Sequence, residues 1–540
     1  MNWPVLLYTF DTAYYITHVF NSMHAPNPGM SLFGSAAARI CAVVAAPTAT
    51  EMVRQLRLAL RETPTVELRL DWLRSDTERS RLLAFLKKNK FRRAVFMATC
   101  RRKVAGGLFA GDLHAELYWL IQAREAGCAW CDLEVETLRE LPAKSIRQYA
   151  VPKRVLLSLH DFERTHSLPP SINVPARGEV DAIKIAAHAR TLADSLRLLA
   201  LARRSRNFVA VPMGEVGLPA RVLALREGSA LAYAPVGQAT APGQVSLHKM
   251  KYLYRAHQLT RATKVYGVIG DPVAHSLSPL LHNSAFAANH INAVYLPFMV
   301  RQLQDFLKAI PAFGIRGFSV TLPHKQSILK FLQGCDPLAA DIGAINTITV
   351  RRDGSLYGAN TDYIGVLRAL QKKLDLATSR ILIFGAGGSA RAAAFALSRA
   401  GASVAICARR QSAGRELARA VGGEVLQRRA LRTQNFDAVL NATPVGMYPH
   451  TKSSPLRASE LHCRIVMDLI YRPQRTALLK IAAGRGIATV SGVEMFLAQA
   501  YAQWEIWMHQ PAPEKIMRHA VLRALRQEES RAPKKAPARA

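Results

Sequence analysis

Residues 380–410 read RILIFGAGGSARAAAFALSRAGASVAICARR, and this stretch decides the fold of the second half of the chain. An apolar run at 381–385 is followed by Gly387 and Gly388, by an alanine-rich helical pattern, and by a second apolar run at 403–407. Strand, glycine turn, helix and strand within about thirty residues are typical of a dinucleotide-binding unit. The glycines let backbone N–H groups approach a pyrophosphate at the positive end of the helix. The stretch predicts a Rossmann lobe, with a plain structural turn as the alternative.

The second strand of this unit ends in Arg409 and Arg410. Enzymes that use NAD place an acidic residue here to bind the ribose hydroxyls, whereas arginine accommodates a 2′-phosphate through charge-assisted hydrogen bonds. The pair therefore predicts NADP(H) as the cofactor. A solvated basic turn is the alternative interpretation.

The composition limits what the protein can be. A chain of 540 residues is too long for one core and predicts several domains. Its formal charge of +34 suits anionic small molecules, although attraction of such substrates explains only part of so large a charge. Basic runs interleaved with aromatics, which would indicate nucleic acid, are not evident, and no apolar run reaches the roughly eighteen residues of a membrane span. Seven scattered cysteines suit a reducing compartment, either a bacterial cytoplasm or a plastid.

The first half of the chain alternates strand-like runs with amphipathic helical patterns. Repetition of eight such units predicts a (β/α)8 TIM barrel. The strand-like runs are 39–46, 65–73, 94–100, 130–136, 154–160, 181–187, 207–214 and 231–237.

Charged residues alternate with apolar ones in two of these runs. Because the apolar face must contact the outer helices, the charged face is expected to point into the barrel. Burial of so many charges is costly unless they pair around a ligand. The two runs therefore predict a site inside the barrel. It is lined by Glu67, Arg69 and Asp71 from one strand and by Asp132, Glu134 and Glu136 from the other.

Lys184 lies in the sixth run between Ala182 and Ala186, which share its face. Small neighbours leave room around a partly desolvated amine, and desolvation favours its neutral form, which can attack a carbonyl. A lysine that is charge-paired with Glu67 or Glu134 is the equally weighted alternative.

These motifs, in this order, resemble the type I 3-dehydroquinate dehydratases over almost all of 39–250. The matching segments are ELRLD (67–71), TCR (99–101), DLE (132–134), SLHDFERT (158–165), IK (183–184), PMG (212–214) and ATAPGQ (239–244). The resemblance implies that Lys184 forms a Schiff base and that His160 is the general acid–base, with no metal. It also implies substrate contacts by Glu67, Arg69, Arg101, Arg221, Thr240 and Gln244.

One position departs from that family. Ala105 stands where a glutamate is usual before Gly-Gly. Loss of this carboxylate is expected to lower the pKa of His160, so that Ala105→Glu would raise kcat for dehydration. In the competing interpretation, Glu134 or another carboxylate already serves His160.

After residue 263 the chain restarts with a strand and a serine turn before a helix. Later segments place polar residues just beyond strands, where open α/β sheets bind ligands. The segments KVYGVIGDPVAHSLSP (264–279), FSVTLPHK (318–325), GAINTI (343–348), GANTD (358–362), NATPVGM (441–447), DLIYRP (468–473) and SGVEMFLAQA (491–500) resemble shikimate dehydrogenase over about 264–525.

This second resemblance implies Lys325 and Asp362 as the catalytic pair, and Ser319 stands where asparagine is frequent in the family. The implied substrate contacts are Ser276, Ser278, Thr321, Asn346, Tyr471 and Gln499. The implied cofactor contacts are Gly385, Ala386, Gly387, Gly388, Ser389, Ala390, Arg409, Arg410, Asn441, Thr443, Gly492 and Met495.

Together the two halves resemble the bifunctional dehydratase–dehydrogenase of aromatic biosynthesis, with 3-dehydroquinate, 3-dehydroshikimate and shikimate as substrates and products. The rivals are a quinate/shikimate dehydrogenase with a weak barrel and a basic nucleic-acid-binding scaffold. The expected organisation is a disordered leader (1–36), the barrel (37–258), a substrate lobe (264–365, completed by helices in 493–525), a Rossmann NADP lobe (366–492) and a disordered basic tail (526–540).

Overall fold

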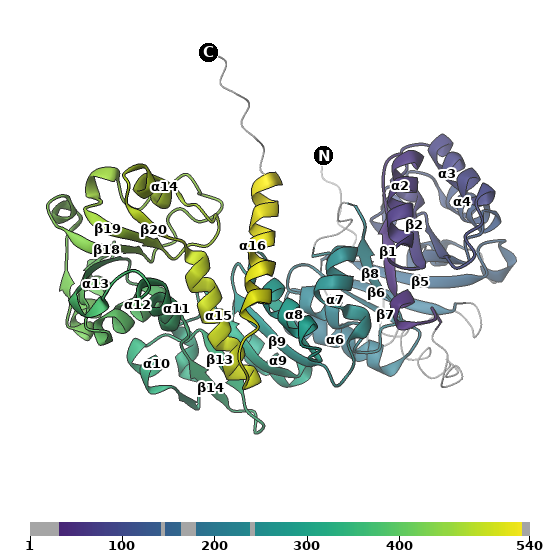
Figure 1. Ribbon diagram of the computed structural model, residues 1–540. Helices are drawn as coiled ribbons and strands as arrows, with labels where there is room; N and C mark the ends of the chain where they lie inside the picture. Colours follow the sequence, from purple (N-terminus) through teal and green to yellow (C-terminus); the bar gives the residue numbers. More distant parts are fainter. Residues whose placement is uncertain (1–31, 142–145, 164–179, 238–242, 532–540) are drawn as a thin grey trace, which may run out of the picture. The chain divides into compact units, whose positions relative to one another are not determined.

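The computed structural model describes residues 32–141, 146–163, 180–237 and 243–531 (Figure 1). The chain forms two compact units. Unit 1 extends to Thr263 and also includes Gln304–Ala312, whereas unit 2 comprises Lys264–Leu303 and the residues from Phe313 onwards. Thr240, most of the predicted leader and residues 532–540 of the predicted tail lie outside the described residues.

Unit 1 contains one sheet of eight parallel strands in the order β7-β6-β5-β4-β3-β2-β1-β8. Next to β8, the Ala230 N–H donates to the Phe208 carbonyl at 2.8 Å, which brings the two ends of the sheet together. The sheet is therefore a nearly closed barrel, and the predicted TIM-type fold is confirmed. Its strands are β1 (Ile40–Val44), β2 (Thr65–Arg69), β3 (Val95–Thr99), β4 (Trp130–Glu134), β5 (Arg154–Asp161), β6 (Ala182–His188), β7 (Phe208–Met213) and β8 (Ala232–Pro235).

Polar side chains set the starts of the helices between these strands. Thr48, Ser75, Asp112 and Thr191 each accept a backbone N–H of the first helical turn, which satisfies a donor that has no partner within the helix. The α-helices are α2 (Ala49–Leu60), α3 (Asp76–Lys88), α4 (Leu113–Glu125), α5 (Val135–Glu140), α6 (Leu192–Arg204) and α7 (Leu218–Leu223).

Two predicted strands end earlier than their alternation suggests. β2 ends at Arg69 and continues as a 3₁₀ turn, Leu70–Trp72. β4 ends at Glu134, which is the N-cap of α5. The placement of Glu136 on the inner strand face was therefore wrong: it lies on α5, because the chain must turn back into a helix at this edge of the barrel.

The end of the predicted leader belongs to the folded barrel. Phe33 is buried and stacks on Trp130, with ring centroids 4.5 Å apart. It packs in one cluster with Cys41, Met97 and Leu156, which lie toward the N-terminal ends of their strands. The prediction of disorder up to residue 36 was wrong for 32–36, because an aromatic side chain covers the apolar interior at this end.

Unit 2 contains two sheets. The first has the order β10-β9-β11-β13-β14-β12, in which β13 is antiparallel to β11 and β14. Its strands are β9 (Lys264–Gly270), β10 (Ala293–Met299), β11 (Ile315–Val320), β12 (Gly334–Cys335), β13 (Thr347–Val350) and β14 (Leu356–Ala359). The helices of this part are α8 (Ser278–Ala288), α10 (Pro337–Ile342) and α11 (Asp362–Leu370). Helix α9 (Leu303–Phe313) follows β10 in the chain, and its residues Gln304–Ala312 belong to unit 1.

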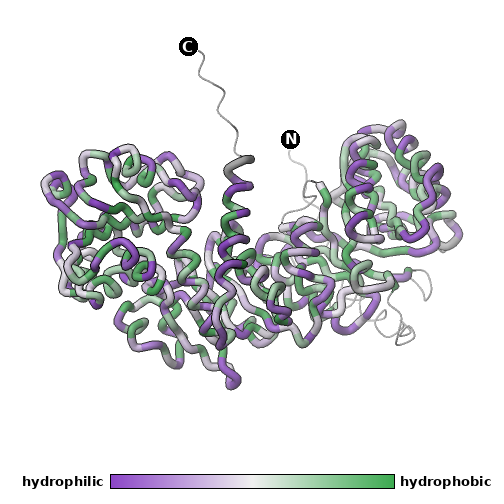
Figure 2. Tube along the Cα trace, in the orientation of Figure 1, coloured by the Kyte–Doolittle hydropathy of each residue, from purple (hydrophilic) through white to green (hydrophobic). Residues whose placement is uncertain are grey.

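The second sheet is parallel, in the order β17-β16-β15-β18-β19-β20, which is the 3-2-1-4-5-6 order of a doubly wound nucleotide fold. Apolar clusters cover both of its faces, and hydrophobic residues follow its strands in Figure 2. The predicted Rossmann architecture is confirmed. The elements are β15 (Arg380–Phe384), β16 (Ser403–Cys407), β17 (Glu424–Val425), β18 (Phe436–Asn441), β19 (Cys463–Asp468), β20 (Ala488–Val490), α12 (Gly388–Arg399), α13 (Gln411–Val421) and α14 (Ala477–Gly484).

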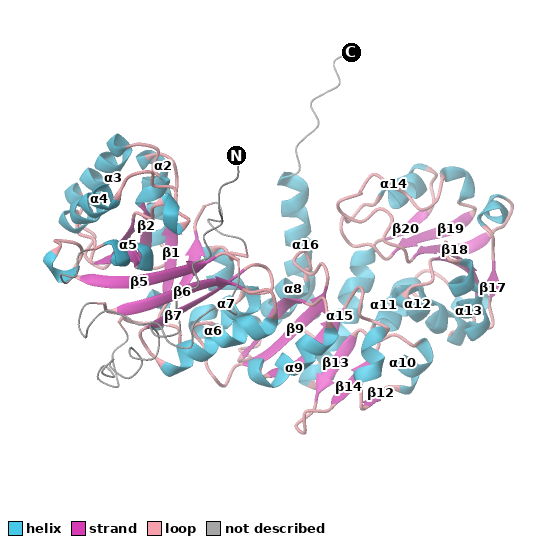
Figure 3. Ribbon diagram, turned by 180° about the vertical axis from the view of Figure 1, so that it is seen from behind, coloured by secondary structure: helices cyan, strands magenta, loops and turns pink. Residues whose placement is uncertain are grey.

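The last two helices return to the first sheet of unit 2 (Figure 3). Trp504 of α15 (Gly492–Met508) and Val521 of α16 (Glu514–Arg531) are buried in one cluster with residues of β9 and α8. Because Leu525 is buried and Glu528 pairs with Arg472 at 2.9 Å, α16 continues to Arg531. The predicted disordered tail is therefore wrong for 526–531. None of the described helices is both long and apolar enough to cross a membrane.

Candidate active sites

Five ionisable side chains form a connected cluster inside the barrel, on β4 to β6 and at the end of β3. The Lys184 ammonium donates to Asp132, and Arg101 Nη2 lies 3.5 Å from the same carboxylate. Arg101 Nε donates to Glu134 at 2.6 Å, and His160 Nδ1 lies 2.8 Å from the other Glu134 oxygen. Strand register explains the grouping, because Glu134 and Lys184 are both paired with Ser158 of β5.

The cluster is buried, with Lys184 3 % and Asp132 2 % exposed, so each charge needs its partner. Burial raises the pKa of Asp132, but the Lys184 and Arg101 charges outweigh this effect and lower it to about 2. Burial raises the pKa of Glu134 to about 7. Burial and the charges of Arg101 and Lys184 hold the pKa of His160 well below its usual value. His160 is therefore a neutral imidazole at pH 7, the form in which it can accept a proton.

The alternative interpretation of Lys184 named Glu67 or Glu134 as its ion-pair partner. Its partner is instead Asp132, and the face of the Tyr233 ring lies 4.9 Å from the ammonium. An amine held between a carboxylate and an aromatic face is positioned for reaction as well as for structure, so the nucleophilic role stays a prediction.

The predicted substrate contacts of the barrel lie on three of its segments. Glu67 accepts a hydrogen bond from Thr99 at 2.7 Å, and Arg69 forms a two-pronged ion pair with Asp71. Arg221 of α7 donates to the Pro212 carbonyl at 2.5 Å, and burial lowers the pKa of its guanidinium to about 10. A buried guanidinium is suited to an anionic substrate. Gln244 is half-buried in the segment after β8.

The alternation of the DLE motif predicts Asp132 and Glu134 inside the barrel, but not their direct contacts with Lys184 and His160, which depend on strand register. One residue beside the cluster, Tyr233, was not predicted. Tyr233 lies in the apolar run 231–237, where an aromatic residue gives no signal of its own.

The geometry around His160 bears on Ala105. Ala105 ends a 3₁₀ turn (Lys103–Ala105) and is buried. The Glu134 carboxylate already lies within hydrogen-bonding distance of His160. This favours the competing interpretation. We expect Ala105→Glu to leave kcat for dehydration flat or lower, because a buried site receives an added charge. The matched variant Glu134→Gln should lower kcat, measured by enone absorbance. A higher kcat in Ala105→Glu would restore the first interpretation.

A second cluster lies in unit 2, where the segments after β11 and before β13 meet the start of α11. The Lys325 ammonium donates to Asp362 Oδ2 at 2.5 Å, and Asn346 Nδ2 donates to Asp362 Oδ1 at 2.8 Å. Lys325 also lies 3.3 Å from the Ser389 hydroxyl at the start of α12. The predicted catalytic pair is thus in direct contact, beside the glycine turn of the Rossmann sheet.

The predicted substrate residues of unit 2 lie in two groups. Asn346 contacts the catalytic pair, whereas Tyr471 lies near Ser276 and stacks on Phe496. Ser278 lies near the Tyr295 phenol. Thr321 follows β11, and the Gln499 amide donates to the carbonyl of Phe496 in its own helix at 2.8 Å.

The turn after β15 fits a dinucleotide. Gly385 has φ +126° and its Cβ position would lie 3.0 Å from the Ala442 carbonyl, so a side chain there would be strained. Gly387 faces open space, and no side chain caps α12, which leaves its first N–H groups available for a pyrophosphate. Gly388 lies close to the Lys325 side chain. Ala386 and Ala390 belong to the same turn and helix start.

The remaining predicted cofactor residues divide into exposed and supporting positions. Arg409 and Arg410 are exposed at the carboxyl end of β16. Asn441 is buried and bonds both Asp468 and the Thr443 backbone, so it shapes the loop after β18. Gly492 allows the start of α15 to approach the Ile470 carbonyl, and Met495 packs against Gly365.

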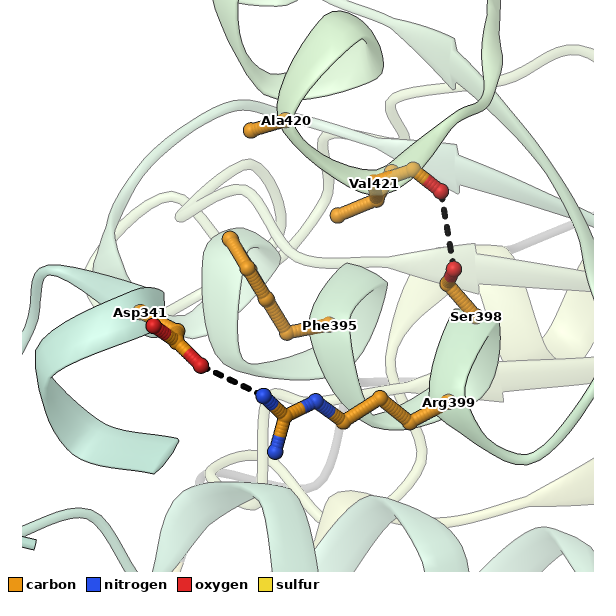
Figure 4. A pocket seen from close by; sticks show the side chains of 6 residues that line it. All are labelled: Asp341, Phe395, Ser398, Arg399, Ala420 and Val421. Carbon is orange, nitrogen blue, oxygen red and sulfur yellow. Dashed lines mark hydrogen bonds and ion pairs between the residues drawn. The ribbon is translucent and has the colours of Figure 1, made fainter. Parts of the chain in front are cut away.

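A separate hollow of about 430 Å³ lies among α10, α12 and α13 (Figure 4). Its lining includes the Asp341–Arg399 ion pair and Ser398, which donates to the Val421 carbonyl at 2.8 Å. It contains none of the predicted site residues, and its one guanidinium is already paired. Among the described residues no group of His, Cys, Asp and Glu side chains has the arrangement to hold a metal ion.

Comparison with known proteins matches the chain to three family models. These are the type I 3-dehydroquinase (residues 40–261), the shikimate dehydrogenase substrate binding domain (268–348) and the shikimate 5'-dehydrogenase C-terminal domain (492–522). The chloroplastic bifunctional 3-dehydroquinate dehydratase/shikimate dehydrogenase of Arabidopsis thaliana is 35 % identical over 504 residues, 88 % of this chain and 83 % of that protein.

Relatives of the second half alone are also found. A shikimate dehydrogenase (NADP(+)) of Methanothermobacter thermautotrophicus is 38 % identical over 282 residues, 49 % of this chain and 99 % of that protein. A solved shikimate 5-dehydrogenase of Thermus thermophilus, in complex with NADP(H) and shikimate, is 32 % identical at a TM-score of 0.45 and covers 49 % of this chain and 100 % of that chain.

Proposed function

Because the chain belongs to the bifunctional 3-dehydroquinate dehydratase/shikimate dehydrogenase family, we propose that it catalyses two consecutive reactions. Its barrel dehydrates 3-dehydroquinate to 3-dehydroshikimate, and unit 2 reduces 3-dehydroshikimate to shikimate with NADPH. The observation that carries the proposal is the buried Lys184–Asp132–Arg101–Glu134–His160 cluster, which supplies an amine and a neutral imidazole inside one barrel.

In the barrel, the Lys184 ammonium first gives up one proton to water, and the resulting amine attacks the substrate ketone to form a carbinolamine. Loss of water from the carbinolamine gives an iminium. The iminium withdraws electrons and acidifies the adjacent C–H bond, from which His160 removes a proton. His160 then protonates the leaving hydroxyl, so that a second water departs as the new double bond forms. Hydrolysis of the iminium consumes one water and regenerates Lys184, which gives a net loss of one water.

In unit 2, bound NADPH supplies the hydride. The α12 N-terminus and the Arg409–Arg410 pair would hold its phosphates, and Lys325 would donate a proton or hydrogen bond to the ketone oxygen as it gains negative charge. Asp362 fixes the ammonium at 2.5 Å and shares the proton in the reverse direction. Ser276, Ser278 and Tyr471 would bind the substrate carboxylate with hydroxyl donors.

Purified protein given 3-dehydroquinate without NADPH tests the proposal directly. Enone absorbance should appear, and added NADPH should then be oxidised as the enone is consumed. A quinate/shikimate dehydrogenase with a weak barrel would oxidise shikimate with NADP⁺ but form no enone from 3-dehydroquinate. That outcome would refute the proposed barrel activity.

The arginines after β16 give a prediction about the cofactor. Arg409→Ala with Arg410→Ala should raise KM for NADPH at least about tenfold, because charge-assisted hydrogen bonds contribute about 1.5–3 kcal/mol each. KM for NADH should change much less, since NADH lacks the 2′-phosphate. Arg415→Ala, in the following helix α13, is the matched control for loss of a nearby positive charge. Equal changes for NADPH and NADH would contradict the phosphate role.

The proposed partners are small anionic molecules, without nucleic acid or membrane. A cytoplasmic location is the expected one, and the plastid alternative has the support of the chloroplastic Arabidopsis relative. A nucleic-acid-binding scaffold would instead require a salt-sensitive DNA mobility shift at nanomolar protein.

A further inference from the structure

A continuous chain of buried hydrogen bonds leads through unit 2 to the catalytic carboxylate Asp362. None of its six side chains is more than 7 % exposed. Its links are Tyr295 Oη to Ser319 Oγ (2.6 Å), Ser319 Oγ to Gln503 Oε1 (2.9 Å), Gln503 Nε2 to Thr347 Oγ1 (3.1 Å), Thr347 Oγ1 to Asn346 Oδ1 (2.8 Å) and Asn346 Nδ2 to Asp362 Oδ1 (2.8 Å).

Backbone groups fix the direction of this chain at the Asp362 end. The Thr361 N–H can only donate, and it contacts Asn346 Oδ1 at 2.7 Å. The amide oxygen of Asn346 is therefore an acceptor, and its NH₂ group must face Asp362. Thr347 also donates to this oxygen. The Thr347 hydroxyl therefore accepts the hydrogen bond from Gln503.

The same reasoning orients the rest of the chain. The backbone carbonyl oxygen of Asn346 can only accept, and it lies 3.4 Å from Gln503 Nε2. The side-chain NH₂ group of Gln503 therefore faces this carbonyl and Thr347. Ser319 then donates to the Gln503 oxygen and accepts from Tyr295. Burial raises the pKa of the Tyr295 phenol, which keeps it protonated and able to donate. Every donor thus points toward Asp362.

Aligned hydrogen bonds strengthen one another, so the chain holds the Asn346 NH₂ group against the Asp362 carboxylate. Lys325 is the charged side chain that contacts Asp362 in the described structure. His282 stacks on Tyr295 at 4.5 Å and stays neutral, because burial lowers its pKa to about 3. The chain ends at Tyr295, which lies near Ser278 of the proposed carboxylate-binding turn.

We propose that Gln503, Thr347 and Ser319 are positioning residues of the dehydrogenase reaction, which orient the Asn346 amide and thereby hold the Asp362 carboxylate in place beside Lys325. The inference rests on the proposed proton-handling role of Asp362. Ser319 stands where asparagine is frequent among shikimate dehydrogenases, and an asparagine could also accept from Tyr295 and donate to Gln503.

Thr347→Val and Gln503→Leu test the chain, with kcat and KM of shikimate oxidation measured separately. Each should lower kcat about tenfold, the equivalent of one hydrogen bond of about 1.4 kcal/mol, with a smaller change in KM. The double variant should lose little more than either single one, since both interrupt one chain.

Conservative variants separate positioning from packing. Thr347→Ser and Ser319→Asn keep a donor and an acceptor at their positions. Their kcat should therefore stay within about threefold of wild type, a difference that small packing changes can cause. Thr349→Val, in the same strand, is the matched control for loss of a threonine hydroxyl. Dehydration by the same preparations and NADP⁺ binding report on folding of both units.

Two results would overturn the inference: losses of kcat that multiply in the double variant, or a Thr347→Ser variant as impaired as Thr347→Val. Failure of the proposed function has a different signature, because the wild-type protein would then show no shikimate-dependent reduction of NADP⁺.

Discussion

Replacing Lys184 by alanine should lower the dehydration rate by at least about 10³-fold, because removal of a covalent nucleophile leaves only binding and electrostatic effects. Shikimate oxidation should stay near the wild-type rate, since Lys325 and Asp362 lie in the other unit of the chain. Both rates can be measured on one preparation by enone absorbance and by NADPH absorbance, so the second activity reports on folding of unit 2.

Lys184→Arg distinguishes chemistry from structure at this position. Arginine keeps the positive charge and can pair with Asp132, but its guanidinium cannot form a Schiff base at neutral pH. We expect Lys184→Arg to be as inactive as Lys184→Ala, although more stable to heat, because Asp132 keeps a partner. Dehydration by Lys184→Arg at close to the wild-type rate would show that the lysine is only an ion-pair partner.

Borohydride gives an independent readout of the same step. Reduction in the presence of 3-dehydroquinate should add the mass of the reduced substrate to the peptide that contains Lys184. An adduct on another lysine would refute the assignment even if Lys184→Ala is inactive.

The pH dependence of dehydration follows from His160. Its pKa lies well below the usual value because of burial and the charges of Arg101 and Lys184. The imidazole therefore stays neutral as pH falls through its ordinary titration range, and the acidic limb of kcat/KM is expected below that range. Arg101→Met, which removes one of the two positive charges, should move the limb to higher pH.

The architecture could be predicted because its signals are local. Alternation in ELRLD and DLE requires an inner and an outer strand face, and GAGG between two apolar runs requires a turn that binds phosphate. Strand ends could not be predicted in the same way. Glu136 continues the alternation of its run, yet the chain begins a helix at Val135, because a barrel edge allows only a few residues before the return.

Long-range partners were the second limit of sequence reasoning. Lys184 pairs with Asp132, 52 residues away, because the register of β4 and β6 on β5 brings them together. Gln503 contacts Ser319, which lies 184 residues away in the sequence. No sequence pattern around either residue predicts that its polar side chain is buried. Motif resemblance predicts the candidate catalytic residues of both clusters, whereas the side chains that contact and orient them follow only from the fold.

Asp362→Asn and Lys325→Ala should each lower kcat of the dehydrogenase by about 10²–10⁴, the usual contribution of a positioned acid–base group. Asparagine is nearly isosteric with aspartate, so Asp362→Asn removes the charge while the Asn346 contact and the start of α11 can persist. Because we propose that the substrate carboxylate is bound by the serine turn and Tyr471, KM for shikimate should change much less than kcat.

Asp341→Asn is the matched control, since it removes a carboxylate of unit 2 whose partner, Arg399, forms an exposed ion pair with it outside the site. Such pairs contribute little, so kcat and the melting temperature should stay close to wild type. Steady-state rates in both directions, with NADP⁺ binding measured separately, complete the test. If either catalytic variant changed KM alone and kept kcat, Lys325 and Asp362 would be binding residues, and the proton would have to come from another group or from water.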